Sequence, residues 1–462
     1  MSNFVKKLKD NRILNKLIWL FPVLYLYEVI MGFNGAQFTI KGMSIRIIFF
    51  CITVAVLGLY CLWIIYSSKM SLLKRKDSQP FFFDYLKPLD YVLLAFLFSN
   101  FIWATVIPIT VRGEMKFSLK EFSTILVLVV YFFLVFLYRT GRLNFSTFEK
   151  LSYAFIIVLG VWHSVMFIGD EIHPGFYKGY YDFIDIISFG TAIRTNVIMG
   201  YGMTRIIQIT SPLLILGTFM SMRYILKGKL VHYIPLSMFI FALCITYTKS
   251  LWFGFAAGLL VYLAGVVISK PDKKLLIRLG AMFLFIVVLI VALNFLVLEN
   301  NVFERIYNSV NNDDAMENID NVEKEDKLDI IGTQQANDLR SAQTGALLRK
   351  WLKNPLVGFG YGSYTEEVIR HIIYPFMYES IFPALVMKLG VFGCLSWVAL
   401  IVAAIISAIK NWWKNNKIQL FWWVGMSIAF AMGIQTNPFL FTFSGFSMVL
   451  YILITTQIKD AE

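Results

Sequence analysis

The sequence has little charge for its length. Only 15% of its 462 residues are Asp, Glu, Lys or Arg, whereas ordinary soluble domains carry about 25%. Hydrophobic residues make up 58%, and the mean hydropathy is +0.67. This composition excludes an ordinary soluble enzyme and indicates a membrane protein before any segment is inspected.

The few cysteines carry no redox or metal motif. Cys51, Cys61, Cys244 and Cys394 all lie inside apolar segments, and no two form a CxxC pair. We therefore predict thiols packed in the core. No DxD pair that could hold a divalent metal occurs in the segments placed outside the membrane below. The sequence predicts neither a metal site nor a cofactor.

Twelve apolar segments are long enough, or nearly so, to cross about 30 Å of hydrocarbon. They are continuously apolar rather than alternating, which excludes a transmembrane β-barrel. We predict an all-α, polytopic bundle of about twelve membrane helices. The segments are Leu14–Met31, Ile45–Tyr66, Tyr91–Val111, Phe122–Tyr138, Leu151–Ile168, Ile206–Met222, Tyr233–Tyr247, Leu251–Ile268, Leu279–Leu298, Phe382–Ile409, Ile418–Gly433 and Phe439–Thr456.

The net charge of +13 does not indicate a nucleic-acid partner, because the basic residues lie in short loops between apolar runs. With the N-terminus inside, every inner loop is basic and both termini are cytoplasmic. The chain then divides into a nine-helix membrane region (1–298), a large extracytoplasmic loop (299–378) and a three-helix membrane region (379–462). We predict that the first apolar segment is an uncleaved spanning helix rather than a secretory signal.

The large loop has two unlike halves. Asn311–Asp329 is acidic and rich in Asn without apolar periodicity, which predicts a flexible lid or a disordered tongue. Asn337–Lys353 has apolar residues at helical spacing and stops at Asn354–Pro355, which predicts a helix.

After Asn354 the chain reads PLVGFGYGSY. Arg340 lies fifteen residues before Pro355, Gly358 and Gly360 follow, and Gly390-Val-Phe-Gly393 comes later. No preceding strand supports a Rossmann fingerprint, and no GK[ST] supports a P-loop. The order instead resembles the C-terminal signature of the O-antigen ligase and polymerase family, the Wzy-type membrane glycosyltransferases.

Two further stretches resemble this family. Thr246–Gly254 reads TYTKSLWFG, similar to the family's T-x-S-R-s-x-W motif. Arg205 is similar to the Arg that opens its middle helix, and Arg349 with Gly360 fits its R-x10-G spacing. The chain departs from the family where Thr344 replaces a Trp, Lys249 replaces an Arg, and Glu379-Ser380 occupies the His/Asn position.

The resemblance implies a metal-independent membrane glycosyltransferase of the bacterial plasma (inner) membrane. It would polymerise lipid diphosphate-linked oligosaccharide repeats into a capsule, O-antigen or exopolysaccharide on the outer face. The implied partners are polyprenyl diphosphate-linked oligosaccharide and membrane lipid, with a flippase and a chain-length regulator of the same pathway as further candidates.

Basic residues outside the membrane run against the positive-inside trend and need a reason. We predict that Arg205, Lys249 and Arg349 bind diphosphate oxygens, with Gly358 and Gly360 beside the substrate. Arg340, Glu379 and His371 are the predicted catalytic residues, because transfer needs a cation for the leaving diphosphate and a base for the acceptor hydroxyl. His173 is another outer base candidate, and Glu379 is favoured since it occupies the His/Asn position.

Structural explanations compete with each of these roles. The outer cations could be headgroup anchors or parts of a solvated helix face, and the glycines could be turn formers. Lys388 lies within an apolar run, where a charge is costly and often functional, or it could only snorkel. Two functions remain as alternatives: a ligase that transfers finished glycan to another acceptor, and a flippase for lipid-linked oligosaccharide. The gathering of candidate residues in one outer loop favours an enzyme over a flippase.

The predicted orientation can be tested by cysteine labelling. Asn321→Cys should react with an impermeant thiol reagent in intact cells, whereas Lys74→Cys should be protected because its loop is cytoplasmic. The reverse labelling pattern would invert the topology.

Overall fold

The computed structural model describes residues 36–37, 39–40, 43–72, 80–111, 113–187, 193–194, 205–310, 324–369, 374–435 and 439–458. Within them the regular secondary structure is helical apart from four two-residue strands, β1 (Ala36–Gln37), β2 (Thr39–Ile40), β3 (Met43–Ser44) and β4 (Ile193–Arg194). β1 pairs with β4 and β2 with β3, both antiparallel. The helices are α3 (Ile45–Ser67), α4 (Pro88–Thr110), α5 (Met115–Ile125), α6 (Val129–Arg139), α7 (Phe145–Ile172), α8 (Phe176–Ile187), α9 (Leu213–Leu226), α10 (Tyr233–Ile245), α11 (Lys249–Ile268), α12 (Lys273–Leu296), α13 (Asn301–Val310), α15 (Lys324–Trp351), α16 (Ile381–Trp412), α17 (Lys417–Gly433) and α18 (Phe443–Thr455).

Seven stretches are helical, long and apolar enough to cross a membrane. α5 and α6 form one of them through the 3-10 turn Leu126–Leu128. The other six are α3, α4, α7, α11, α12 and α16. The stretches Leu213–Leu226, Leu230–Ile245 and Phe443–Thr455 are apolar but shorter, and α17 has 17 residues. The predicted all-α class is confirmed for the described residues, and the predicted segment Leu14–Met31 lies outside them.

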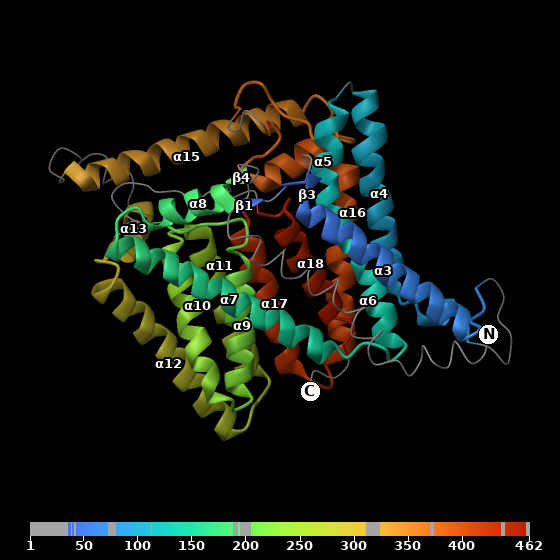
Figure 1. Ribbon diagram of the computed structural model, residues 1–462, viewed down its shortest axis with the longest axis horizontal. Coiled ribbons are helices and arrows are strands. Elements are labelled where there is room, and N and C mark those ends of the chain that lie inside the picture. Colours follow the sequence, from blue (N-terminus) through green and yellow to red (C-terminus); the bar gives the residue numbers. More distant parts are fainter. Residues whose placement is uncertain are drawn as a thin grey trace.

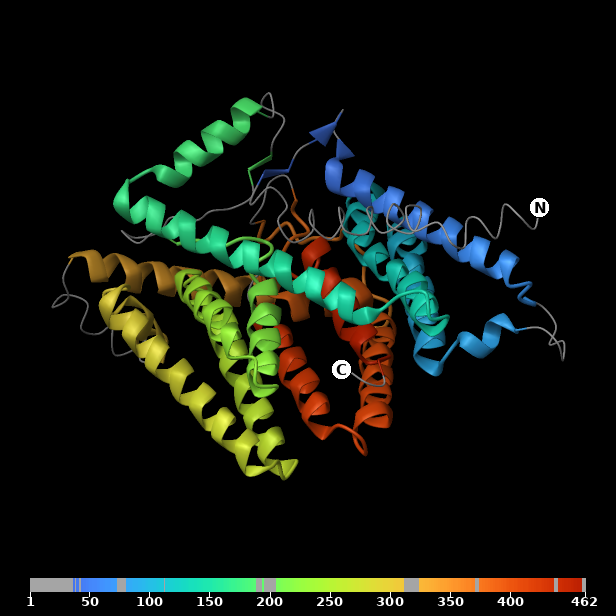
Figure 2. The same cartoon turned by 60° about the horizontal axis from the view of Figure 1, so that its bottom comes forward.

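The helix predicted within the large loop exists and is longer than predicted. α15 begins at Lys324, so the last residues of the stretch predicted as a flexible lid are helical, and it ends at Trp351. In both views α15 runs across one end of the bundle rather than along it (Figures 1 and 2).

Close backbone approach joins α11 to α17. A Cβ on Gly254 would lie 2.5 Å from the Ala429 carbonyl oxygen, and one on Gly258 would lie 2.3 Å from that of Gly425. Small residues four apart let two apolar helices approach where lipid offers no hydrophobic drive for association.

A break at Gly390 divides α16 into two helical halves. Gly390 has φ +59° and ψ −170°, a backbone conformation that glycine adopts without a steric penalty. The break leaves carbonyls at the end of the first half and amides at the start of the second half without helical partners. The segment Pro355–Gly360, which we call the glycine loop, supplies them.

The glycine loop caps both halves. The amides of Phe359 and Gly360 donate to the Lys388 carbonyl at 3.1 and 2.7 Å, and the Val391 amide donates to the Pro355 carbonyl at 3.0 Å. The Trp103 indole of α4 donates to the Val357 carbonyl at 2.7 Å. Irregular backbone at this depth is tolerated because protein satisfies its polar groups.

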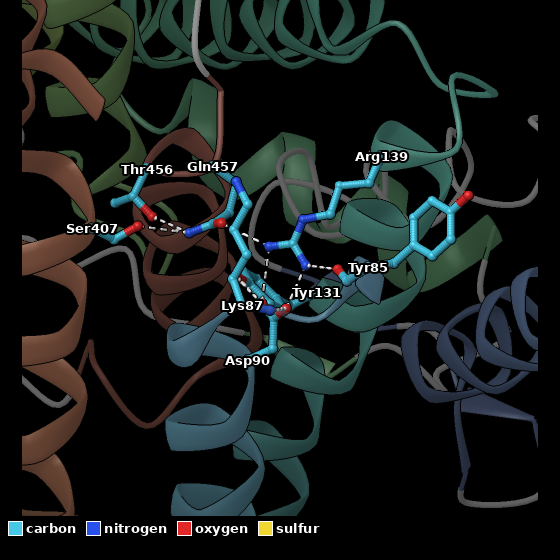
Figure 3. A network of polar contacts seen from close by, with 8 residues as sticks. All are labelled: Tyr85, Lys87, Asp90, Tyr131, Arg139, Ser407, Thr456 and Gln457. Atoms are coloured by element: carbon cyan, nitrogen blue, oxygen red, sulfur yellow. Dashed lines mark hydrogen bonds and ion pairs between the residues drawn. The ribbon is translucent and has the colours of Figure 1, made fainter. Parts of the chain in front are cut away.

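A polar network at the other end of α4 and α6 ties four helices together (Figure 3). Arg139 pairs with Asp90 and donates to the Gln457 side chain at 2.7 Å. The Tyr131 hydroxyl donates to Asp90 at 2.8 Å, and the Gln457 amide donates to Ser407 at 3.0 Å. The bundle is therefore held by charge-assisted hydrogen bonds as well as by apolar packing.

One prediction about the core is only partly right. Cys61 and Cys244 are buried as expected, but Cys51 is exposed and Cys394 is half-buried. Hydropathy places a residue in the membrane without telling which face of its helix points to lipid, so these two thiols could not be assigned correctly.

Gly390→Ala should destabilise the folded protein. A Cβ there would lie 2.5 Å from the Gly358 amide nitrogen, and the positive φ adds strain, so we expect a loss of about 2 kcal/mol or more. Gly280→Ala in α12 is the matched control, because its Cβ would meet nothing within 4 Å. Thermal unfolding of the purified variants would show a lower Tm for the first alone. Equal Tm values would contradict the capping role of the break.

Candidate functional site

Two of the predicted catalytic residues meet at one end of the bundle. Arg340 projects from α15, and Glu379 lies two residues before α16. The Arg340 Nε donates to Glu379 Oε2 at 3.0 Å. The arginine side chain is 36% exposed and the carboxylate 11%. The structure thus joins a cation and a carboxylate from segments 39 residues apart in the sequence.

Gln343 belongs to the same cluster and was not among the predicted residues. Its Oε1 accepts the backbone amides of Glu379 and Ser380, each at 3.1 Å. Gln343 is 1% exposed, and its Nε2 has no hydrogen-bond partner among the described residues. Thr344 donates to Ser380 at 3.1 Å. Positions 340, 343 and 344 share one helix face, which is the one sequence signal that could have suggested Gln343.

A second cluster forms around Arg205. Its Nε donates to the Thr246 carbonyl at 2.8 Å and its Nη2 to the Thr248 hydroxyl at 3.2 Å. Lys249 follows as the first residue of α11 and is half-buried. Tyr247, which lies between Thr246 and Thr248 in the sequence, is buried and has φ +45°. This backbone conformation is strained for a bulky residue, and such strain is often found at functional sites.

The start of α18 and the connection before it contact residues near both clusters. The Phe441 ring lies 5.9 Å from that of Tyr361, next to the glycine loop. Ser444 donates to the Ile209 carbonyl at 3.1 Å, in the segment that follows Arg205. Lys388 Nζ lies 5.5 Å from the Phe441 ring. The two clusters are therefore built onto one continuous scaffold.

The glycines of the loop have a packing role. Gly358 has φ +73° and Gly360 φ +79°. A Cβ on Gly358 would lie 2.5 Å from the Gly390 nitrogen, and one on Gly360 would lie 2.7 Å from Pro108 Cγ. Protein atoms thus explain why both positions are glycine, and contact with substrate stays a prediction.

The remaining predicted residues lie elsewhere or outside the description. Arg349 pairs with Glu367 at 2.5 Å, and both side chains are more than half exposed, so this pair adds little stability. His371 lies outside the described residues. His173 is an exposed residue just after α7. On α15, burial lowers the pKa of Lys350, whose amine donates to the Tyr364 carbonyl.

A buried ion pair between Lys388 and Glu121 supports the segment that carries Glu379. Lys388 Nζ lies 2.5 Å from Glu121 Oε1, and both side chains are 2% exposed. Glu121 Oε2 accepts the Gly362 amide at 2.7 Å, and Lys388 also donates to the Phe376 carbonyl at 2.9 Å. The pair thus fixes α5 and α16 to both ends of the segment 362–376, and Lys388 does not snorkel to the surface.

The comparison with protein families identifies the region that holds most of these residues. Residues 234–398 match the family model described as O-antigen ligase. This region is similar to the O-antigen ligase family. The match includes Lys249, Arg340, the glycine loop, Glu379 and Gly390, while Arg205 precedes it.

The family resemblance predicted from the motifs is confirmed by this match. No curated protein matches the chain. The match and the apolar helices together indicate a membrane protein that is similar to glycosyltransferase-like enzymes and has a role in glycan assembly. Among the described residues no group of three or more His, Cys, Asp or Glu side chains could hold a metal ion.

The buried ion pair gives a stability prediction. Lys388→Met would leave Glu121 charged and buried without its partner, which costs about 3–5 kcal/mol. Adding Glu121→Leu should recover part of this loss, but not all, because the Gly362 amide would still lack an acceptor. Thermal unfolding should rank the wild type above the double variant and the double variant above Lys388→Met. A Lys388→Met protein as stable as the wild type would exclude the support role.

Proposed function

We propose that this protein polymerises lipid diphosphate-linked oligosaccharide repeats into a cell-surface polysaccharide, a capsule, O-antigen or exopolysaccharide. The observation that carries the proposal is the Arg340–Glu379 pair at the start of α16, within the O-antigen ligase domain. It supplies a cation and a proton acceptor in one place, which are the two groups that the reaction needs.

The proposal includes a topology with both termini in the cytoplasm. The shorter helices α9, α10, α17 and α18, with the predicted segment Leu14–Met31, would bring the spans to twelve. Residues 1–298 and 379–462 would be the membrane regions, and 299–378 the extracytoplasmic loop. The position of α15 across one end of the bundle supports this arrangement (Figure 1).

Each residue has a defined part in the transfer. The acceptor sugar hydroxyl attacks the anomeric carbon of the donor glycan, and the bond from that carbon to the diphosphate oxygen breaks. Glu379 takes the hydroxyl proton, and the diphosphate leaves with the bonding electrons. Arg340 and Arg205 stabilise its charge through bidentate hydrogen bonds. Gln343 positions Glu379 and Ser380 by holding both backbone amides.

The ligase function fits the same residues and the family description equally well. It would use the same donor and the same cations, with a different final acceptor. The position of Glu379-Ser380 at the family's His/Asn element is the sequence feature that favours polymerisation. A flippase fits less well, because the charged candidates gather at the end of the bundle and not along a passage.

A deletion strain separates these functions. Loss of a polymerase leaves single repeats on the carrier at the outer leaflet, loss of a ligase leaves long chains on the carrier, and loss of a flippase strands single repeats on the inner leaflet. We expect the first outcome when extracted lipid-linked glycans are sized on gels. Long lipid-linked ladders that persist in the deletion strain would exclude polymerisation.

Complementation of that strain tests the residues. Arg340→Ala should reduce chain growth by about 10²–10³-fold and Glu379→Gln by about 10²–10⁴-fold, while both proteins insert normally. Arg340→Lys should also be poor, because an ammonium cannot form the planar fork. Lys353→Ala is the control, because Lys353 is an exposed residue just after the end of α15, and it should restore wild-type ladders. Full activity of Glu379→Gln would remove Glu379 from the mechanism.

A further inference from the structure

An apolar cavity of about 240 Å³ lies between α10, α11, α12 and α13. Its walls include Leu243, Trp252, Ala256, Phe283, Val287 and Phe303. A water molecule needs two to four polar partners, which these hydrocarbon and aromatic walls do not offer. The cavity is therefore suited to a hydrocarbon chain.

One end of this cavity adjoins the Arg205 cluster. Trp252 lines the cavity and lies one helical turn after Lys249. Its indole Nε1 donates to the Leu243 carbonyl at 2.8 Å, so its polar atom is satisfied and its ring serves as an apolar wall. Leu243 and Lys249 flank the turn whose Thr246 and Thr248 hold Arg205. An apolar pocket and a cationic site thus share one turn.

Helix α13, which forms one end of the cavity, is held in place by a side chain of α12. Asn294, 1% exposed at the end of α12, accepts the backbone amides of Val302 and Phe303 at 3.1 Å each. This side chain therefore caps α13 at its first turn. The cap holds the apolar side chains of α13 against the cavity.

We propose that this cavity binds the prenyl chain of the carrier lipid next to its diphosphate, which lies against Arg205 and Lys249. The inference rests on the proposed function, because it assumes a lipid diphosphate donor. The inference adds to the proposed function a binding site for the hydrocarbon part of the lipid. This site is formed by α10, α11, α12 and α13, next to the turn that holds Arg205. A chain held there orients the diphosphate, so the apolar prenyl tail and the anionic diphosphate head are recognised together.

Binding to full-length protein in phosphatidylcholine nanodiscs tests the site, with empty nanodiscs subtracted. The probes are geranylgeranyl diphosphate, inorganic diphosphate and phosphatidylglycerol. Ala256→Trp fills the cavity and should raise the Kd for geranylgeranyl diphosphate about tenfold or more, leaving that for inorganic diphosphate unchanged. Val287→Trp, from the opposite wall, should do the same. Arg205→Ala should weaken both diphosphate probes.

Ala281→Trp is the matched control, because Ala281 is an exposed residue of α12 outside the cavity lining, and it should bind like the wild type. Wild-type affinity for geranylgeranyl diphosphate in both cavity-filling variants would overturn the inference and leave the proposed function standing. Displacement of that probe by equimolar phosphatidylglycerol would also overturn it, since the cavity would then hold bulk lipid. A wild-type protein that binds no geranylgeranyl diphosphate would contradict the donor class itself.

Discussion

The candidate site depends on one constraint, the need to satisfy backbone hydrogen bonds where α16 breaks at Gly390. Inside a bilayer an unpaired amide or carbonyl costs several kcal/mol, so a helix can be interrupted only where another segment takes over its partners. Here the glycine loop does so, with the Lys388 carbonyl and the Val391 amide as its principal contacts. The positive φ values of Gly358 and Gly390, and the absence of side chains there, allow the two backbones to touch.

This junction places the chemical groups. α15 ends just before the glycine loop, and the first half of α16 begins just after Glu379. Fixing the loop to α16 therefore brings Arg340 and Glu379 within hydrogen-bond distance. The Lys388–Glu121 pair fixes the far side of the same segment through Gly362 and Phe376. Arg340 is thus preorganised, which would make electrostatic stabilisation of the proposed leaving diphosphate effective.

Sequence reasoning predicted the parts of this arrangement that follow from local patterns. The apolar segments, the helix after Asn337 and the motif spacing from Arg340 to Gly360 can all be read along the chain. The helical face that carries Arg340 also carries Gln343, but a single Gln gives no signal of its own. What could not be predicted depends on contacts across the fold: Glu121 as the partner of Lys388, the break in α16, and the exposure of Cys51. In each case hydropathy sets the depth of a residue in the membrane but not its neighbour.

The central claim is that this scaffold performs glycosyl transfer from a lipid diphosphate. The most direct measurement mixes purified full-length protein with a synthetic polyprenyl diphosphate-linked repeat and sizes the products. The account predicts that single repeats are consumed, that longer chains form on the same carrier and that free polyprenyl diphosphate is released, all without added nucleotide sugar. A well-folded wild-type protein that leaves the repeats unchanged, or one whose Arg340→Ala variant turns them over at the wild-type rate, would contradict it.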